Sequence, residues 1–367
     1  MNQLKNIICF IIFISISFIV KSTEKDYSNV VNDTTSVFTF SINDFDDCFL
    51  FKLNHIDTSL ISFQFNDPSY KISPFTASLG NIGLSQRNLF YSSPQISFFN
   101  AGNHYINNYL FTPDNIEYFI AKKPFTDLYY TTGARKEQVF RVRQSIPFKN
   151  NFYLGADYLI INSNGRELFR QKSANEHLCF NSKFYSKNNK YAVFASYIHN
   201  KVKNYENGGI QDDVLFENRE DKKDNTLFFL NDAESRYKES YVTLNNYYNF
   251  FDKLANTENK SDTLKIKRNK LLLSHNFSFK RSFRIYEDKE PSSGFYNNIF
   301  LNNEKTYDST FCSALNNEIK ISSTFINIDS LNDLFKLSFI IGHEFTKWNT
   351  YDVDTSYNGI APQILFQ

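Results

Sequence analysis

The 367 residues carry 40 Lys and Arg against 39 Asp and Glu, so the formal net charge is only +1. This balance excludes a nucleic-acid binder that neutralises phosphates with a basic surface, and the length allows one large β-domain or two smaller ones. With 40 Phe and 23 Tyr but one Trp and one Met, the composition is typical of aromatic-rich strands joined by polar loops. An AT-rich genome would explain the excess of Asn and Lys equally well.

The N-terminus, residues 1–22, predicts a secretory signal peptide. Lys5 supplies the positive region, "NIICFIIFISISFIV" is an apolar run, and "VKS" places the small Ser22 before a cleavage point. The alternative is a membrane anchor, but the run is shorter than the roughly 20 residues that a spanning helix needs. Processing would leave Cys48, Cys179 and Cys312. This odd, widely spaced set indicates neither a disulfide framework nor a metal site, and we predict no cofactor.

Residues 23–123, called here the pre-barrel segment, lack long alternation and hold most of the turn signals, as in "FNDPSYKISPF", "LGNIGL" and "LFTPDN". Such punctuation predicts short strands and loops. We expect this segment either to plug the structure that follows or to pack at its periplasmic side.

From residue 124 onward, aromatic and β-branched stretches recur and are separated by polar gaps. They predict strands near residues 125–133, 138–147, 151–163, 175–186, 190–201, 239–250, 268–286, 310–323 and 334–348. Short connections such as "PFKNN" and "SKNNK" alternate with long polar ones, which is the pattern of outer-membrane barrels. The connection over residues 251–267 is longer than its predicted periplasmic side suggests.

The strands have two different faces. In "RKEQVFRVRQSIPF", Phe140 and Val142 alternate with Arg141 and Arg143; the segments "LLLSHNFSFK" and "FKLSFIIGHEFT" alternate in the same way. Because no later stretch resembles a spanning helix, membrane insertion would require a β-barrel, the other backbone arrangement that satisfies every amide in lipid. The arginines would then face water inside the barrel. A soluble β-sandwich, with its polar face in water, is the alternative.

Some positions break the alternation. Leu159 and Ile161 share the face of Asp157 in "NFYLGADYLIIN", and Ile340 falls on a polar face. His275 and His343 fall on apolar faces. A lipid-facing sheet must place these histidines near an interface, unless the register is misjudged.

Several phrases resemble the putative porin family of Gram-negative outer membranes in content and order. They are "KPFTDLYYTTGARKEQVFRVRQS", "NFYLGADYLIINSNG", "YAVFASYIHNKVKNYENGGIQDDVLFENRE" and "KTYDSTFCSALNNEI", with "LFTPDNIEYF" and "LGNIGL" similar to the family's pre-barrel region. The resemblance covers roughly residues 57–341. It implies an outer-membrane barrel inserted by the barrel-assembly machinery. Members tend to be longer, and nine or ten strands are counted here, so a truncated chain remains open.

Catalytic patterns are weak. "HEFTK" has Lys347 where a zinc protease needs its second His, and we predict no metal site. His104, His177 and His199 could belong to an outer-membrane hydrolase, although nothing pairs them with a nucleophile.

We therefore predict an all-β, antiparallel transmembrane barrel over residues 124–367, located in the cell outer membrane. The predicted function is a porin-like channel, not an enzyme, whose partners are outer-membrane lipid and small hydrophilic solutes; formation of a homo-oligomer is left open. A non-conducting structural or adhesive barrel is the alternative. The residues predicted to line the pore are Arg141, Arg143, Asp157, Lys280, Lys336 and Glu344. Pairing of Asp157 with Arg141 or Arg143 in the wall is an equally good reading of those residues.

Overall fold

The computed structural model describes most of the chain after residue 104 and shorter stretches before it. The described residues are 37–42, 54–56, 67–71, 75–90, 105–148, 151–165, 171–188, 190–212, 214, 217, 227–257, 265–291, 294–296, 306–327, 334–350 and 353–366. The signal-peptide prediction, Cys48 and His104 lie outside them.

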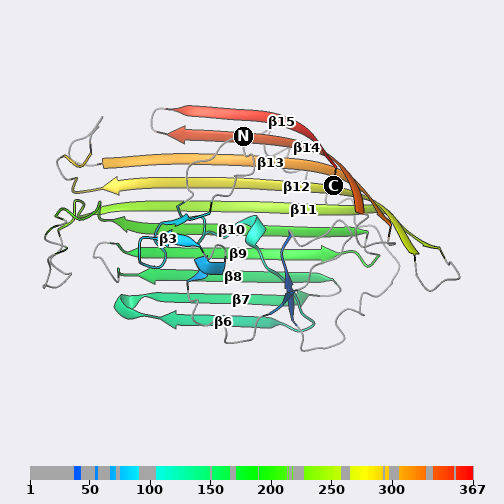
Figure 1. Ribbon diagram of the computed structural model, residues 1–367, viewed down its shortest axis with the longest axis horizontal. Coiled ribbons are helices and arrows are strands. Elements are labelled where there is room, and N and C mark those ends of the chain that lie inside the picture. The colour runs from blue at the N-terminus through cyan, green and yellow to red at the C-terminus, as the bar shows by residue number, and fades with distance from the viewer. Residues whose placement is uncertain are drawn as a thin grey trace.

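A ten-stranded antiparallel sheet dominates the fold (Figure 1). Each strand pairs with its neighbours in sequence, in the order β15 to β6. The strands are β6 (Phe125–Thr132), β7 (Gln138–Phe148), β8 (Phe152–Ser163), β9 (Ser173–Tyr185), β10 (Tyr191–Glu206), β11 (Ala233–Thr257), β12 (Lys265–Asp288), β13 (Thr306–Asn327), β14 (Leu334–Thr350) and β15 (Asp354–Phe366). The predicted all-β antiparallel fold is confirmed.

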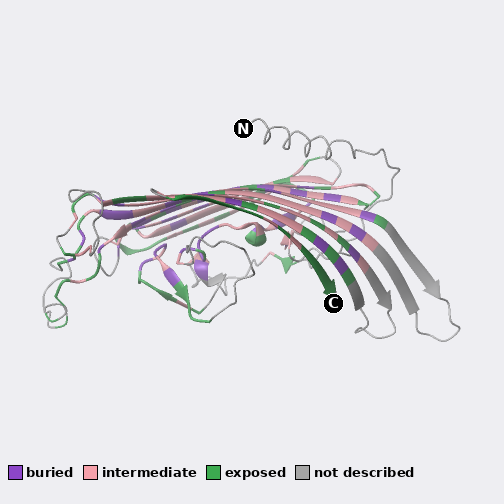
Figure 2. Cartoon of the chain, turned by 90° about the horizontal axis from the view of Figure 1, so that it is seen from above, coloured by how far each residue is buried: buried purple, intermediate pink, exposed green. Residues whose placement is uncertain are grey.

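The sheet is curved, and its two ends do not meet. The strands bend toward one side, which we call the inner side (Figure 2). Among the described residues, β6 pairs only with β7 and β15 only with β14, so the sheet is open along those two edges.

All nine predicted strand segments are present, and β15 is an additional one. Its sequence contains Gly359 and Pro362, which interrupt the alternation. Proline lacks a backbone N–H and is therefore tolerated in an edge strand, which is the position that β15 occupies.

The connection over residues 251–267 is shorter than predicted because β11 continues to Thr257 and β12 begins at Lys265. The four connections at that end of the sheet are consequently all short. At the opposite end, residues 164–172, 207–232 and 289–305 form long connections. The β6–β7 and β14–β15 connections at that end are short. The predicted pattern of short connections at one end and long ones at the other therefore holds for three of the five connections at this end.

The described part of the pre-barrel segment lies on the inner side of the sheet (Figure 2). Its strands β1 (Phe38–Phe40), β2 (Asn54–His55) and β5 (Tyr118–Ile120) form one small sheet, and β3 (Thr76–Ser78) pairs with β4 (Gln86–Asn88). Short 3-10 turns occur at η2 (Pro68–Lys71), η3 (Pro113–Asn115) and, between β6 and β7, η4 (Ala134–Lys136). Among the described residues, no helix has the length and apolar character needed to cross a membrane.

The core lies between this segment and the sheet. In the largest cluster, Phe40, Ile116 and Tyr118 pack against Phe194 and Ile198 of β10. A second cluster joins Ile106 and Leu110 to β10 and β11, and a third joins Tyr109 to β7 and β8. The apolar core is therefore an interface between the pre-barrel segment and β7–β12.

Candidate functional site

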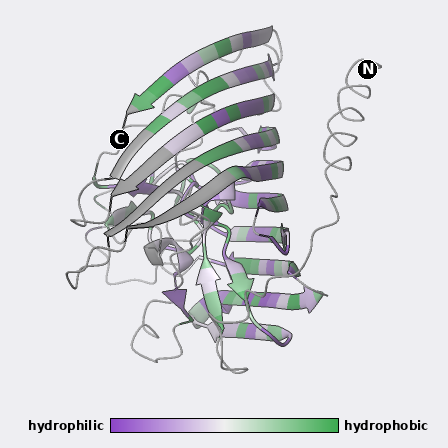
Figure 3. Cartoon of the chain, turned by 90° about the vertical axis from the view of Figure 1, so that its right-hand side faces the viewer, coloured by the Kyte–Doolittle hydropathy of each residue, from purple (hydrophilic) through white to green (hydrophobic). Residues whose placement is uncertain are grey.

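The outer face of the large sheet exposes large apolar side chains. Apolar and polar residues alternate along its strands (Figure 3). Cross-strand pairs such as Leu128 with Val142 and Val142 with Tyr158 keep the outward residues in register. Every strand contributes at least one exposed large apolar side chain to this face: Leu128, Ile146, Leu154, Phe180, Tyr197, Val242, Phe283, Ile319, Phe339 and Ile360. Exposed apolar side chains that extend across all ten strands are unusual on a protein surface in water and are suited to lipid.

Polar groups on the outer face bond to one another. His275 Nε2 lies 2.6 Å from Asn317 Oδ1, and Asn246 lies 3.5 Å from His275 Nδ1. His343 Nε2 lies 2.9 Å from Asn358 Oδ1. The structure therefore places both histidines on the outer face, as the alternation predicts, and a cross-strand asparagine binds Nε2 of each ring.

The inner face is polar and carries the predicted charges. Arg141 and Asp157 form a two-pronged ion pair, with Nε–Oδ1 at 3.0 Å and Nη2–Oδ2 at 2.6 Å. Arg143 instead binds Asp127 of β6 and Glu117, which precedes β5. The side chains of Arg141 and Arg143 are only 18% and 14% exposed. Both guanidinium groups are therefore matched by carboxylates in the wall.

Phenylalanines of the pre-barrel segment cover these arginines. The guanidinium carbon of Arg141 lies 5.6 Å from the ring centre of Phe111, and that of Arg143 lies 5.6 Å from the ring centre of Phe119. Such contacts stabilise a cation by the negative face of the ring. The two arginines thus connect the sheet to the pre-barrel segment as well as to neighbouring strands.

A second charged cluster lies on the inner face of β10–β12. Lys280 Nζ of β12 lies 2.8 Å from Glu239 Oε2 of β11, and the Glu239 side chain is only 1% exposed. The carboxylate also accepts hydrogen bonds from Asn200 Nδ2, at 3.1 Å, and from Tyr237 Oη. A buried carboxylate needs such a set of partners to offset its lost hydration.

Asn200 extends this cluster to the pre-barrel backbone. Its Oδ1 accepts from the Phe111 N–H at 3.1 Å and its Nδ2 donates to the Phe111 carbonyl at 2.8 Å. The same Oδ1 lies 2.9 Å from His177 Nδ1. The buried amide therefore links Phe111, His177 and Glu239.

The pre-barrel loop before β4 is fixed in a similar way. Asn175 Nδ2 donates to the Gly83 carbonyl at 2.8 Å, and Ser173 Oγ donates to the Ile82 carbonyl at 2.6 Å. Gly83 has φ +83°, and a Cβ there would lie 2.9 Å from both donor atoms. Only glycine fits both this backbone conformation and this close approach.

The two remaining residues predicted to line the pore, Lys336 and Glu344, both lie in β14. Lys336 is in β14, but its side chain lies outside the described set. Glu344 of β14 is half-buried and accepts a hydrogen bond from Thr346 Oγ1 at 3.1 Å.

Burial alters the ionisation of tyrosines in the pre-barrel segment. Desolvation raises the pKa of Tyr109, and the nearby Asp67 carboxylate raises that pKa further. The Tyr109 hydroxyl donates to Asp67 Oδ2 at 3.0 Å and accepts from Gln86 Nε2 at 2.6 Å. Burial also raises the pKa of Tyr118. Both phenols are thus neutral structural groups at physiological pH.

The described histidines do not converge. His177 is fully buried on the inner face, whereas His199 lies on the outer face, 2.9 Å from Ser240 Oγ. Among the described residues, no group of three metal-binding side chains forms a metal site. Cys179 and Cys312 are buried, and neither forms a disulfide.

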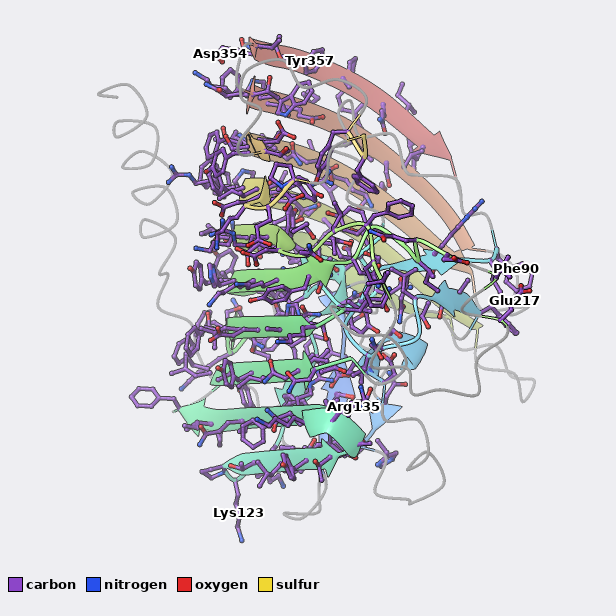
Figure 4. The ribbon with its side chains drawn as sticks, turned by 90° about the vertical axis from the view of Figure 1, so that its left-hand side faces the viewer. Phe90, Lys123, Arg135, Glu217, Asp354 and Tyr357 are labelled. Carbon is purple, nitrogen blue, oxygen red and sulfur yellow. The ribbon has the colours of Figure 1, made fainter. Side chains whose placement is uncertain are left out.

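Sequence reasoning did not single out Asn175, Asn200 and Glu239. Each lies on the inner face at the period of two that marks a strand, but many inward polar residues share that signal. Their partners are backbone atoms of a distant irregular segment, which no local pattern reveals. Figure 4 shows side chains of the sheet and of the pre-barrel segment on the same concave side.

Comparisons with known proteins give one family. The family model described as "Putative porin" matches residues 44–365. No curated protein matches the chain. Among solved structures, the chain is similar to the ferric-catecholate import receptor Fiu from E. coli K12. The open form matches at TM-score 0.31 and 10% identity over 70% of this chain and 53% of that one. The closed form matches at TM-score 0.32 and 10% identity over 72% of this chain and 50% of that one. The match thus spans about half the length of either receptor chain.

Proposed function

The chain belongs to the "Putative porin" family, and from this premise we propose that it forms an outer-membrane channel through which small hydrophilic solutes diffuse passively. Membership supports an outer-membrane β-barrel channel rather than an enzyme. The observation that carries the proposal is the contrast between the faces of one sheet. The outer face exposes apolar side chains on every strand, and its ion pairs, such as Lys203 with Glu234 and Arg236 with Glu287, lie at the end of the sheet that carries the long connections. The inner face holds ion pairs and buried amides. Lipid on one side and water on the other would satisfy both.

The open path would run along the inner face of β13–β15. The pre-barrel segment packs against β7–β12 through its three apolar clusters and its hydrogen bonds to Asn175 and Asn200. It therefore acts as a partial plug of the space beside those strands. The inner face of β13 and β14 offers polar groups instead, such as Glu318, which accepts from Asn276 at 3.2 Å. Export through a cleaved signal peptide at residues 1–22, insertion by the barrel-assembly machinery and association of copies belong to the same proposal.

Wall charges would then set ion preference according to whether the plug covers them. Arg141, Arg143 and Asp157 are covered, so they chiefly hold the plug. Lys280 and Glu344 border the uncovered path, and Lys336 is in the same strand as Glu344.

The proposal is tested by conductance of the purified, folded chain in planar bilayers. We expect ohmic channels, and we expect Glu344→Lys to shift the reversal potential in a salt gradient toward anions, because it replaces a negative wall charge by a positive one. The matched control is Lys347→Glu, also in β14 but on the outer face and paired with Asp354 at 3.1 Å. It should leave the reversal potential unchanged.

A bilayer that stays silent although the protein migrates as a folded species would contradict the channel. That result would favour a structural or adhesive barrel, which the long connections over residues 207–232 and 289–305 could serve. Reversal-potential shifts of equal size and opposite sign from Glu344→Lys and Lys347→Glu would instead contradict the assignment of the inner face to the water path.

A further inference from the structure

A cavity of about 360 Å³ lies at the end of the sheet that carries the long connections. Four parts of the chain form it: Tyr105 of the pre-barrel segment, the inner face of β10–β12, the β10–β11 connection and the β12–β13 connection. The volume falls at the lower end of the range for small-molecule sites. A solute approaching from the long connections would meet this cavity before it reached the rest of the inner wall.

Two opposite charges face the cavity from different strands. Arg284 of β12 and Glu206 of β10 both line it. In the part of the chain that the structure describes, neither forms an ion pair within 4 Å. Charges on the opposite, outer face at the same end of the sheet are paired, as in Arg236 with Glu287 and Lys203 with Glu234. Glu206 Oε1 accepts a hydrogen bond from Ser235 Oγ at 2.8 Å, which fixes the carboxylate.

Aromatic rings complete the wall. The guanidinium carbon of Arg284 lies 5.4 Å from the ring centre of Tyr105, which holds the guanidinium group at one side. Tyr286 is oriented by its hydroxyl, 2.8 Å from that of Tyr296, which donates in turn to Asp288. Phe295 packs on Tyr296 with ring centres 5.0 Å apart. These rings offer a rigid apolar surface between the two charges.

Gly208 keeps the cavity open on the side of the β10–β11 connection. It has φ +69°, and a Cβ there would lie 2.6 Å from Leu230 Cγ and 3.0 Å from Phe295 Cε2. The Leu230 N–H donates to the Asn207 carbonyl at 3.0 Å, so the base of the connection is fixed beside the cavity. Local backbone geometry thus maintains the space.

We propose that this cavity binds a small zwitterion of amino-acid or dipeptide size, with its carboxylate on Arg284, its ammonium on Glu206 and its apolar side chain against Phe295 and Leu230. A guanidinium group matches a carboxylate with two parallel hydrogen bonds, and a fixed carboxylate matches an ammonium. A neutral sugar would leave both charges without a counter-charge. The inference rests on the proposed function, because it names a solute class for the channel.

The test is calorimetric titration of the full folded chain in detergent with the dipeptide glycylphenylalanine, its C-terminal amide, its N-acetyl form and maltose. We expect the free dipeptide to bind and each blocked form to bind at least tenfold more weakly. Arg284→Gln should remove the preference for the free carboxylate while keeping the preference for the free ammonium. Glu206→Gln should remove the preference for the free ammonium while keeping the preference for the free carboxylate.

The matched control is Arg281→Gln, which lies on the outer face of the same strand beside Phe311 and should bind as the wild type does. Heat-shifted gel migration verifies that each variant is folded. No binding of any dipeptide, equal affinity for free and blocked forms, or binding of maltose alone would overturn the assignment. Bilayer conductance is measured separately. Conductance without dipeptide binding would contradict the proposed binding site alone. Dipeptide binding without conductance would contradict the proposed channel alone.

Discussion

Phe194→Ala is expected to release the plug and to cost about 3–5 kcal/mol of unfolding free energy, the usual range for a buried phenylalanine. Phe194 of β10 is fully buried, and its ring meets those of Phe40 and Tyr118 from the pre-barrel segment and those of Tyr185 and Tyr247 from the sheet. No other side chain joins the two parts through as many described ring contacts. Its removal leaves a cavity at that junction.

The measurement is denaturant unfolding in detergent together with limited proteolysis. The pre-barrel segment should become cleavable in Phe194→Ala while the sheet stays protected, and channel conductance should rise. The matched control, Tyr197→Ala, removes an aromatic ring from the outer face of the same strand, where 41% of the residue is exposed. Loss of less than about 1 kcal/mol in Phe194→Ala, with no new cleavage, would show that the plug does not depend on this cluster.

Lys280→Met is expected to cost about 3 kcal/mol, because it leaves the buried Glu239 carboxylate without its cation. Asn200 and Tyr237 would still donate to that carboxylate, so the loss should fall short of a fully isolated buried charge. The double variant Lys280→Met with Glu239→Gln should regain much of the loss, since the uncompensated charge is then gone.

The comparison pair is Lys347 with Asp354, whose side chains are 44% and 56% exposed. Lys347→Met should cost less than about 1 kcal/mol, as exposed ion pairs contribute little. Denaturant unfolding of the three variants and of the wild type, with midpoint and slope, measures all of these free energies. Equal losses for Lys280→Met and Lys347→Met, or no recovery in the double variant, would contradict the account of Glu239 as a buried charge held by partners.

The alternation of apolar and polar residues was enough to predict most of the strands and their two faces. A period of two across "RKEQVFRVRQSIPF" separates Phe140 from Arg141, and the structure places them on opposite faces of β7. The exceptions have a physical cause. Leu159 and Ile161 break the pattern because Tyr109 of the pre-barrel segment packs on them, so that stretch of the inner face is buried rather than wet.

What the sequence could not reveal depends on distant contacts. Asn200 binds the backbone of Phe111, 89 positions away, and any inward amide would look the same in the sequence. β15 was missed because Gly359 and Pro362 weaken its strand signal. The cavity beside Arg284 is formed by segments that become neighbours only in the folded chain.

The most direct test of the channel is the swelling of liposomes that contain the purified protein in isotonic sugars of increasing size. We predict fast swelling in arabinose and progressively slower swelling in glucose, sucrose and stachyose, because a water path beside a partial plug admits small solutes first. Faster entry of arabinose into Phe194→Ala liposomes should accompany release of the plug. Liposomes that swell in none of the sugars, although the protein in them is folded, would contradict passive diffusion through this chain.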